Sequence, residues 1–440
     1  MERYIYQHLL EWKHTQNHKP LILRGARQVG KTYIVRKLSK NFSNFIEVNF
    51  ESEPGLTSIF QGNLSPNDIC EKLSAYYNES ITDGKTLLFF DEIQACPEAI
   101  KSLRYFYEKR PDLHVIAAGS LLEFALKDLS SYGVGRIRSV FMYPLSFNEF
   151  LKAAGASSLL KIKQKADFSN KPDDIFHNKL NALFVKFLII GGMPEAVDTY
   201  FKTNDLIKTQ HVLDDIIISL EDDFVKYKTR ANTTRIKEVF SSVLHQTRNK
   251  FTISTASNSG NYAQKKEALE MLEMAGLCYK VYHTSANGLP LAAELNRKKF
   301  KLVFFDTGIL QRSLRLNLAD FVLSDELKMI NKGNIVEQYI GLEYVKCCHA
   351  FTKPELYYWH REKRGSSAEV DYVFEINSQI IPVEVKSGMQ GKMKSLFMFL
   401  EMKNQPFGVR TSLENFDVYD KVQVYPLYAI DNLFSDLFTE

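Results

Sequence analysis

Short apolar runs alternate with amphipathic stretches through the first 150 residues of the chain. The apolar runs have the length and composition of buried strands, and they read "PLILR", "FIEVNF", "TLLFFDE" and "HVIAAGS". Between them, helical patterns are found at Pro66–Tyr77 and Pro97–Lys109, and another helix is expected after Gly30. Strands that alternate with helices are typical of a parallel sheet covered by helices. We therefore predict an α/β domain over residues 1–150.

The next two regions have a different pattern. From about Phe141 to Asp223 the apolar positions follow a helical period, which is broken by the Gly-Gly and Pro of "IIGGMPEAV". This pattern predicts a helical lid or linker over residues 151–225. Residues 226–310 then contain helical "RIKEVFSSVLHQ", turn-rich "FTISTASNSG", helical "YAQKKEALEMLEMAG" and two strand-like segments around the loop "TSANGLPL".

Helix, turn, helix and hairpin is the order of a winged helix-turn-helix, which we predict for residues 226–310. Ala268, Met271, Leu272 and Ala275 share one face of its second helix. A purely structural linker with the same elements remains an alternative, as does a winged domain that docks proteins. A last αβ region is predicted for residues 311–440.

Length and composition limit the class of protein. A chain of 440 residues with 45% hydrophobic content can bury sizeable cores and favours about three domains. No apolar run approaches the roughly 18 residues that span a bilayer, and the N-terminus lacks the apolar core of a secretory signal. We therefore expect no membrane segment and a cytoplasmic location. The five cysteines are scattered, so their spacing suggests neither a disulfide framework nor a zinc site.

Positive charge is concentrated in the middle of the chain. Residues 226–301 hold 14 Lys and Arg against 5 Glu, a net charge of +9, whereas the whole chain carries +4 and the remainder therefore −5. This asymmetry suggests an acidic partner, with DNA bound through the basic winged-helix region as the expected one. A solvated basic face is the alternative.

The stretch "GARQVGKT" fits the pattern G-x-x-x-x-G-K-[ST] and stands between an apolar strand and a helix. Its two glycines permit a tight loop whose backbone N–H groups point at phosphate oxygens. Lys31 is expected to reach the β- and γ-phosphates, and Thr32 to offer its hydroxyl to Mg²⁺. ATP and Mg²⁺ are therefore the expected cofactors. The residues expected to contact the nucleotide are Gly25, Ala26, Arg27, Gln28, Val29, Gly30, Lys31, Thr32 and Tyr33.

Two further apolar strands end in residues suited to ATP hydrolysis. "LLFFDE" ends in Asp91, a candidate Mg²⁺ ligand, and Glu92, a candidate for polarising the attacking water. "HVIAAGS" ends in Ser120, which we expect beside Glu92 as a sensor of the γ-phosphate. Arg136 is a candidate for stabilising charge in the transition state, and Arg138 competes for that role.

A second set of charged residues occurs near the C-terminus. "AEVDYVFEINSQIIPVEVKSG" predicts a hairpin with Asp371 on one strand and Glu384 and Lys386 on the other. The spacing D-x₁₂-E-x-K is that of restriction-endonuclease-like nucleases, in which two carboxylates hold Mg²⁺ beside a lysine. Glu337, in a predicted helix, is a candidate to complete the set. An ordinary exposed Glu–Lys pair, or a degenerate nuclease fold kept for binding, remains open.

Several stretches occur in a characteristic order: "RGARQVGKT", "LLFFDEIQ", "AAGS", "GR" at Gly135–Arg136, "YPLSFNEF", "GGMPEAV", "FDTGIL", "G-x₃-E" ending at Glu337, and "EVDYVFE…VEVKSG". Over nearly the full length, the set resembles the prokaryotic AAA-type ATPases that carry a C-terminal domain of unknown function with a restriction-endonuclease-like, PD-(D/E)xK, fold. The resemblance implies an α/β P-loop NTPase core with a helical lid, a winged helix-turn-helix and a nuclease-like α/β domain. It supports nucleotide roles for Lys31, Thr32, Asp91 and Glu92, and nuclease roles for Glu337, Asp371, Glu384 and Lys386.

We therefore expect a Mg²⁺-dependent ATPase that couples its nucleotide state to DNA engagement. The alternatives are an ATP-gated, metal-dependent nuclease, and a nucleotide-switch module that binds protein through a degenerate nuclease fold. No second sensor arginine can be identified between residues 150 and 225, so assembly into a homo-oligomer is left open.

Overall fold

The structure, a computed structural model, describes residues 1–129, 133, 135–227, 232–247, 249–315, 332–362, 368–388 and 393–438. The chain divides into two compact units. The N-terminal unit comprises residues 2–143 and 350–353, and the C-terminal unit comprises residue 1, 144–349 and 354–440. The predicted boundaries at 225 and 310 lie within the C-terminal unit and stay predictions.

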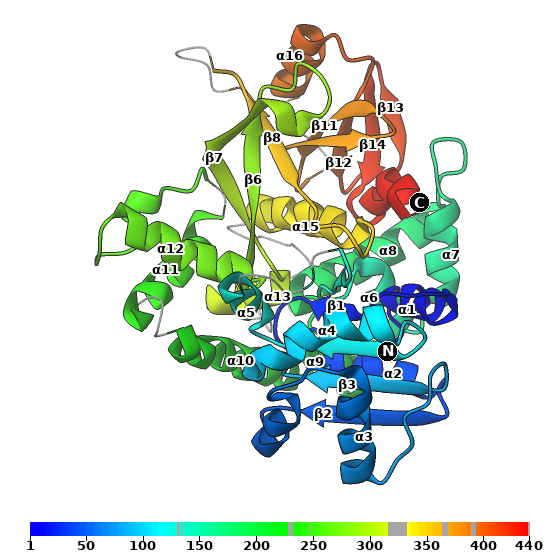
Figure 1. Cartoon of the computed structure of the whole chain (residues 1–440). Helices are drawn as coiled ribbons and strands as arrows, with labels where there is room; N and C mark the ends of the chain where they lie inside the picture. The colour runs from blue at the N-terminus through cyan, green and yellow to red at the C-terminus, as the bar shows by residue number, and fades with distance from the viewer. Residues whose placement is uncertain are drawn as a thin grey trace. The chain divides into compact units, whose positions relative to one another are not determined.

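A five-stranded parallel sheet forms the centre of the N-terminal unit, in the order β2-β3-β4-β1-β5 (Figure 1). This confirms the predicted α/β core with a parallel sheet. The strands β3 and β4 are buried along their whole length, which explains why they read as continuous apolar runs. The strands are β1 (Leu21–Arg24), β2 (Asn44–Asn49), β3 (Thr86–Asp91), β4 (His114–Ala118) and β5 (Arg138–Phe141).

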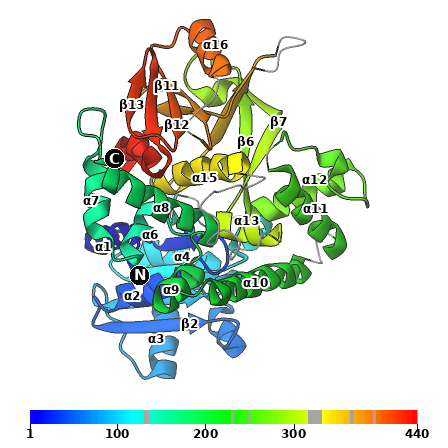
Figure 2. The same ribbon diagram turned by 180° about the vertical axis from the view of Figure 1, so that it is seen from behind.

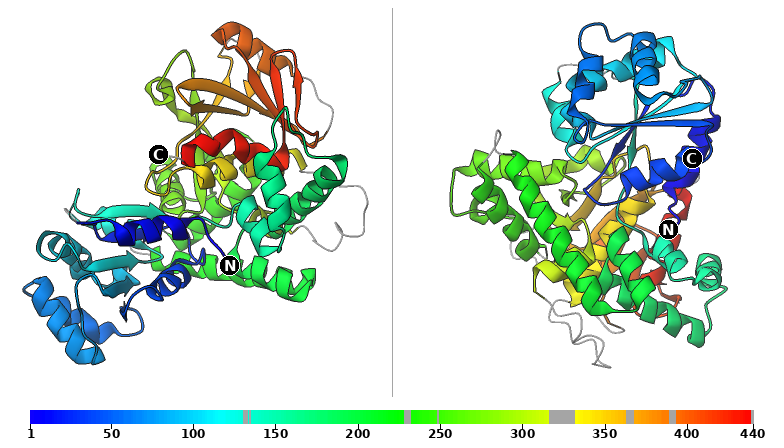
Figure 3. Two further views of the ribbon diagram at one scale, coloured as in Figure 1. Left: turned by 90° about the vertical axis from the view of Figure 1, so that its right-hand side faces the viewer. Right: turned by 90° about the horizontal axis from the view of Figure 1, so that it is seen from below.

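Helices cover both faces of this sheet (Figure 3, right). On one face, α3 and α4 pack on a core that includes Phe50, Phe60 and Phe90, whose rings meet at centroid distances of 5.4 to 6.0 Å. Burying each of these rings contributes roughly 1.5–3 kcal/mol. The helices are α1 (Ile5–His14), α2 (Lys31–Ser39), η1 (Pro54–Phe60), α3 (Pro66–Tyr77), η2 (Ile93–Ala95), α4 (Pro97–Lys109) and α5 (Leu122–Asp128).

The C-terminal unit begins with the predicted helical region. The Gly-Gly of "IIGGMPEAV" directly follows α8, and the lack of side chains there leaves room for Asp306, which comes from a distant part of the chain. Its Oδ2 accepts a hydrogen bond from Gly192 N at 2.6 Å, and a Cβ on Gly191 would lie 2.2 Å from its Oδ1. The helices of this region are α6 (Phe147–Ala153), α7 (Ser157–Lys165), α8 (Asp174–Ile190), α9 (Pro194–Thr203), α10 (Leu206–Asp223) and η3 (Phe224–Tyr227).

The next segment has the predicted order of helix, turn, helix and hairpin, with α11 and α12 beside β6 and β7 (Figure 2). The hairpin differs from a free wing, since β6 also pairs in parallel with β8, which pairs with β9. The result is a four-stranded sheet in the order β7-β6-β8-β9. The elements are α11 (Thr233–Gln246), η4 (Ile253–Thr255), α12 (Tyr262–Met274), β6 (Cys278–Thr284), η5 (Leu291–Glu294), β7 (Leu295–Phe304), α13 (Thr307–Ser313), β8 (Leu356–His360) and β9 (Glu369–Val370).

A second, mixed sheet follows in the order β10-β11-β12-β14-β13. Its predicted hairpin β10/β11 turns at Asn377 and Ser378, whose φ angles of 50° and 57° suit a two-residue type I′ turn. No helix in the described ranges is both long and apolar enough to cross a bilayer. The elements are α15 (Lys332–Cys347), β10 (Tyr372–Ile376), β11 (Gln379–Val385), α16 (Lys394–Lys403), β12 (Gly408–Ser412), β13 (Asp417–Tyr419), β14 (Val422–Pro426) and η6 (Leu427–Phe438).

Candidate functional site

The loop between β1 and α2 has a backbone that only glycine allows at two points. Gly25 has φ 138°, and a Cβ there would lie 2.0 Å from the carbonyl oxygen of Met142. Gly30 is the N-cap of α2 with φ 95°, so the chain enters the helix from a left-handed conformation. The N–H groups of the first turn of α2 have no acceptor within the helix and point toward the loop, as an anion site requires.

Lys31 is buried in this loop, 9% exposed, and its ammonium lies against the loop backbone. Its Nζ donates to the carbonyl oxygens of Gly25 at 2.9 Å and Ala26 at 2.8 Å. Burial lowers the pKa of Lys31 to about 8, although the charges of Glu92 and Asp91 oppose this shift. The two carbonyl groups are neutral, so they do not balance the charge of the Lys31 ammonium. The ammonium is therefore already in place to bind a phosphate.

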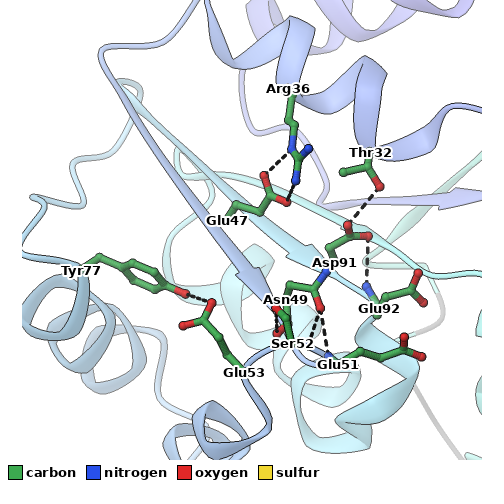
Figure 4. Close-up of polar contacts among 10 residues, drawn as sticks. All are labelled: Thr32, Arg36, Glu47, Asn49, Glu51, Ser52, Glu53, Tyr77, Asp91 and Glu92. Atoms are coloured by element: carbon green, nitrogen blue, oxygen red, sulfur yellow. Dashed lines mark hydrogen bonds and ion pairs between the residues drawn. The ribbon is translucent and has the colours of Figure 1, made fainter.

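Thr32 and Asp91 form the second contact of this site (Figure 4). Thr32 Oγ1 donates to Asp91 Oδ2 at 3.0 Å, which joins the first turn of α2 to the end of β3. Burial raises the pKa of Asp91, and the hydrogen bonds from Thr32 and the Glu92 backbone oppose that shift. A hydroxyl and a carboxylate side by side are hard oxygen donors, so the pair fits the Mg²⁺ that the sequence implies.

Glu92 lies directly after β3, with a left-handed φ of 48°. Its Oε2 accepts hydrogen bonds from Gln94 Nε2 at 2.5 Å and from both the N and Oγ of Ser120 at 3.3 Å. Ser120 is therefore beside Glu92, as the sequence led us to expect. Gln94 was missed, although it stands two residues later in "DEIQ". A Cβ on Gly119 would lie 1.9 Å from Gln94 Oε1, so a glycine there leaves room for this amide.

The remaining nucleotide candidates lie on the loop or beyond it. Ala26 and Val29 are buried, Arg27 is half-buried, and Gln28 and Tyr33 are exposed. Arg136 forms an ion pair with Glu108 on α4, and Arg138 lies 4.8 Å from the Phe351 ring centroid. Among the described contacts, neither arginine touches Lys31 or Glu92. The role of Arg136 in the transition state stays a prediction.

The nuclease-like residues predicted near the C-terminus lie in one charged cluster of the C-terminal unit. Asp371, between β9 and β10, accepts a hydrogen bond from Val385 N at 2.8 Å. Lys386 Nζ lies 2.6 Å from Glu384 Oε1, and Glu384 Oε2 is buried with no partner among the described residues. Glu337, on α15, is bound instead to Lys301.

Lys301, on β7, is a member of this cluster that the sequence did not reveal. Its Nζ lies 3.0 Å from Glu337 Oε1 and 2.6 Å from Glu369 Oε1, and its side chain is 6% exposed. Burial alone would lower the pKa of Lys301, but the nearby carboxylates outweigh burial and raise it. In the sequence, Lys301 is one of several lysines in a basic stretch, and only the tertiary structure separates it from them.

Burial also changes the pKa values of the acidic residues in this cluster. It raises the pKa of Glu337 and of Glu384 to about 7, and it raises the pKa of Asp371. Among the described residues, the carboxylates of Glu337, Asp371 and Glu384 do not bring three ligand atoms within 4.8 Å of one another. Asp371 and Glu384 supply oxygen donors of the kind that Mg²⁺ takes, while lysines supply the positive charge in this arrangement.

Three family models match successive parts of the chain. Residues 17–151 match an AAA domain, residues 181–320 a domain of unknown function (DUF8612), and residues 332–430 another domain of unknown function (DUF4143). Residues 17–151 have the AAA-type ATPase fold. This confirms two parts of the predicted resemblance: the chain has an AAA domain, and domains of unknown function follow it. The nuclease-like fold of the last part stays a prediction.

Solved structures with similarity to the chain include the Walker-type ATPase PABY2304 of Pyrococcus abyssi, at 17% identity and TM-score 0.46, covering 72% of this chain and 96% of that one. The ORC1 protein of Aeropyrum pernix in complex with DNA matches at 12% identity and TM-score 0.29, covering 72% and 93%. Drosophila ORC bound to DNA matches at 12% and 0.25, covering 71% and 94%. No curated protein shows a significant match. Similarities with TM-scores this low do not show which activity or ligands this chain has.

Proposed function

We propose that the chain is a Mg²⁺-dependent ATPase whose nucleotide state controls how its C-terminal unit engages DNA. The ATPase activity in this proposal rests on the contact between the start of α2, which follows the glycine-rich loop, and the end of β3. Lys31 is fixed on the loop carbonyls, and Thr32 Oγ1 lies 3.0 Å from Asp91 Oδ2. A cation and a pair of hard oxygen donors thereby meet at the N-terminus of α2, where phosphates bind.

In this proposal each residue has one task. Lys31 exchanges its two carbonyl partners for phosphate oxygens, and Thr32 and Asp91 hold the metal. Bound Mg²⁺ would neutralise developing charge on the phosphates. Glu92 accepts the proton of the attacking water, while Gln94 and Ser120 keep its carboxylate in place through the hydrogen bonds to Oε2.

The charge of residues 226–310 supports DNA as the ligand, and we propose a winged helix-turn-helix there. Several of its lysines are already paired, since Lys280 lies 2.5 Å from Glu273 and Lys237 lies 3.3 Å from Glu221. Arg297 and Lys298, exposed on β7, have no ion-pair partner among the described residues. They are the strongest candidates for contacts to DNA phosphates.

One observation favours a second function, an ATP-gated nuclease of restriction-endonuclease-like fold in residues 311–440. Asp371, Glu384 and Lys386 interact electrostatically within one buried cluster, as such an activity requires. The opposing observation is Lys301, which balances the carboxylates without a metal and is compatible with a degenerate fold kept for binding.

The ATPase part is tested with two variants of the full chain. Lys31→Ala should bind no ATP, whereas Glu92→Gln should bind ATP and hydrolyse it at least about 100-fold more slowly. Lys37→Ala, a lysine later on the same helix, serves as the control. Wild-type turnover in Lys31→Ala and Glu92→Gln would contradict the proposal.

The DNA part is tested by measuring DNA affinity across salt concentrations with ADP and with a non-hydrolysable ATP analogue. Arg297→Ala/Lys298→Ala should reduce the salt slope by about 1 to 2, because each lost phosphate contact releases one counterion fewer. Lys101→Ala, exposed on α4, is the control. Affinity that is independent of both salt and nucleotide would leave protein docking as the better explanation. Plasmid incubated with Mg²⁺ or Mn²⁺ tests cleavage, with Asp371→Asn and Lys386→Met as inactive controls.

A further inference from the structure

Two histidines and a glutamate come together at the end of β6 and β8, where His360 pairs with Glu369 on the neighbouring strand β9. One ring nitrogen each of His283 and His360 and one carboxylate oxygen of Glu362 all lie within 4.8 Å of one another. Within the described residues, this is the one group of three His, Cys, Asp or Glu side chains that meets this condition. We propose that His283, His360 and Glu362 bind a Zn²⁺-class transition-metal ion.

The orientation of His283 prepares one of its nitrogens for a metal. Its Nε2 donates a hydrogen bond to the carbonyl oxygen of His360 at 3.3 Å, so the proton of the neutral ring is on Nε2 and Nδ1 keeps its lone pair. This Nδ1 is buried and has no hydrogen-bond partner among the residues that the structure describes, and it lies 3.9 Å from Glu362 Oε1. Metal-bound histidines commonly have their second nitrogen fixed by a backbone carbonyl in this way.

His360, the second histidine of the group, also has an unsatisfied ring nitrogen. Its Nδ1 is also buried, with no hydrogen-bond partner in the described part of the chain, and its ring centroid lies 4.4 Å from that of His283. Leaving a buried nitrogen unpaired costs about 1–3 kcal/mol, so two adjacent ones favour a ligand that uses both lone pairs. Burial lowers the pKa of His360 to about 4 and also lowers the pKa of His283.

The donor set selects the class of metal. Two imidazoles and a carboxylate suit Zn²⁺ or Co²⁺, whereas Mg²⁺ prefers oxygen ligands alone. In a tetrahedral Zn²⁺ site with bonds of about 2.1 Å, ligand atoms lie about 3.4 Å apart, so Nδ1 of His283 and Glu362 need to approach by only about 0.5 Å. Three protein ligands leave one coordination position for water or another ligand.

Lys299 competes with the metal for the carboxylate. Its Nζ lies 2.6 Å from Glu362 Oε1, but the two side chains are 41% and 53% exposed, so the lysine can turn into solvent. Removing this competing charge should therefore strengthen metal binding. A substitution of Lys299 should thus raise the metal affinity, whereas the loss of a ligand should lower it.

The test is a titration of the untagged full chain with Zn²⁺ by calorimetry, and with Co²⁺ by visible absorption. The wild type should bind one ion per chain, and the Co²⁺ complex should show tetrahedral d–d bands without a thiolate charge-transfer band. His360→Ala and Glu362→Ala should weaken binding roughly 100-fold, and Lys299→Met should tighten it several-fold. Because Glu362 is half exposed, Glu362→Ala remains informative if His360→Ala does not fold.

Two controls separate this site from others. His245→Ala, at an exposed position on α11, and Asp371→Asn, in the nuclease-like cluster, should bind Zn²⁺ as the wild type does. Wild-type affinity in His360→Ala and Glu362→Ala would overturn the proposal. So would a loss of Zn²⁺ binding in Asp371→Asn alone, since it would place the ion in the cluster of Glu384. ATPase activity is not a readout here, so the outcome is independent of the proposed function.

Discussion

Gln94 Nε2 donates a hydrogen bond to Glu92 Oε2 at 2.5 Å, across the tight turn that follows β3. Ser120, from the end of β4, donates to the same oxygen through its N and its Oγ. Because three donors occupy Oε2, Oε1 is the oxygen that would take the proton of water in the proposed ATPase reaction. Gln94 thus acts on Glu92 as a positioning residue.

Replacing Gln94 should lower turnover without changing ATP binding. We expect Gln94→Leu to reduce kcat about tenfold, as loss of an orienting hydrogen bond does elsewhere, and to leave KM for ATP unchanged. Steady-state ATPase kinetics measure both constants. Gln61→Leu, an exposed glutamine of the same unit, should behave as the wild type. An equal rise in KM would show that Gln94 contacts the nucleotide instead.

ATP binding should take up a proton at alkaline pH. The pKa of Lys31 is lowered to about 8 by burial, so above pH 8 the amine of the free protein is mostly neutral. Phosphates favour the ammonium and restore its charge, so at pH 9 binding in the presence of Mg²⁺ should take up close to one proton, and far less at pH 7. Calorimetry in buffers of different ionisation enthalpy measures this number. Equal uptake at both pH values would contradict the assignment.

Lys301 should be more important for stability than Lys386. Lys301 is buried between two carboxylates, so Lys301→Met leaves buried charges without a partner and should lower the free energy of unfolding by about 3–5 kcal/mol. The Lys386 side chain is 24% exposed, and Lys386→Met should cost about 1 kcal/mol. Urea unfolding measures both values. Adding Glu337→Gln to Lys301→Met should recover part of the loss, and equal effects of the two lysines would contradict the prediction.

The N-terminal unit should lose stability in mild acid through His114. Its ring stacks on His18 at a centroid distance of 3.9 Å, and burial lowers its pKa to about 4 from the ordinary 6.5. Between pH 6.5 and 4 the unfolded chain therefore binds more protons than the folded chain. The free energy of unfolding is therefore highest above pH 6.5. As the pH falls toward 4, protonation of His114 in the unfolded chain lowers it by up to about 3 kcal/mol.

His114→Phe should flatten this pH dependence, since the ring still packs on Trp12 and Phe42 but no longer titrates. Urea unfolding followed by the fluorescence of Trp12, with Trp359→Phe as background, measures the N-terminal unit. His211→Gln, at an exposed position, should keep the wild-type slope. An unchanged slope in His114→Phe would assign the acid sensitivity to other groups.

Much of the nucleotide site could be predicted from sequence because its parts are local. "GARQVGKT" contains the two glycines, the lysine and the threonine within one loop, and the apolar run before Asp91 indicates a buried strand. Gln94 was missed because its role depends on the turn at Glu92 and on the space beside Gly119, which no residue pattern expresses.

The C-terminal unit shows the opposite case. The order of helix, turn, helix and hairpin was readable from periodicity, and so was the hairpin with Asp371 and Glu384. The pairing of β6 with β8 was not readable, because it joins strands that are more than 70 residues apart.

That pairing decides which side chains meet. It sets His283 beside His360, while the antiparallel partner β7 carries Lys301 to Glu337 and Glu369. By itself, the sequence determined most of the helices and strands, the glycine-rich loop before α2 and the two acids at the end of β3, since local periodicity and short spacing specify these features. Only the tertiary structure decided which buried charges are paired and which ring nitrogens remain without a partner among the described residues, because both depend on side chains that lie far apart in the sequence.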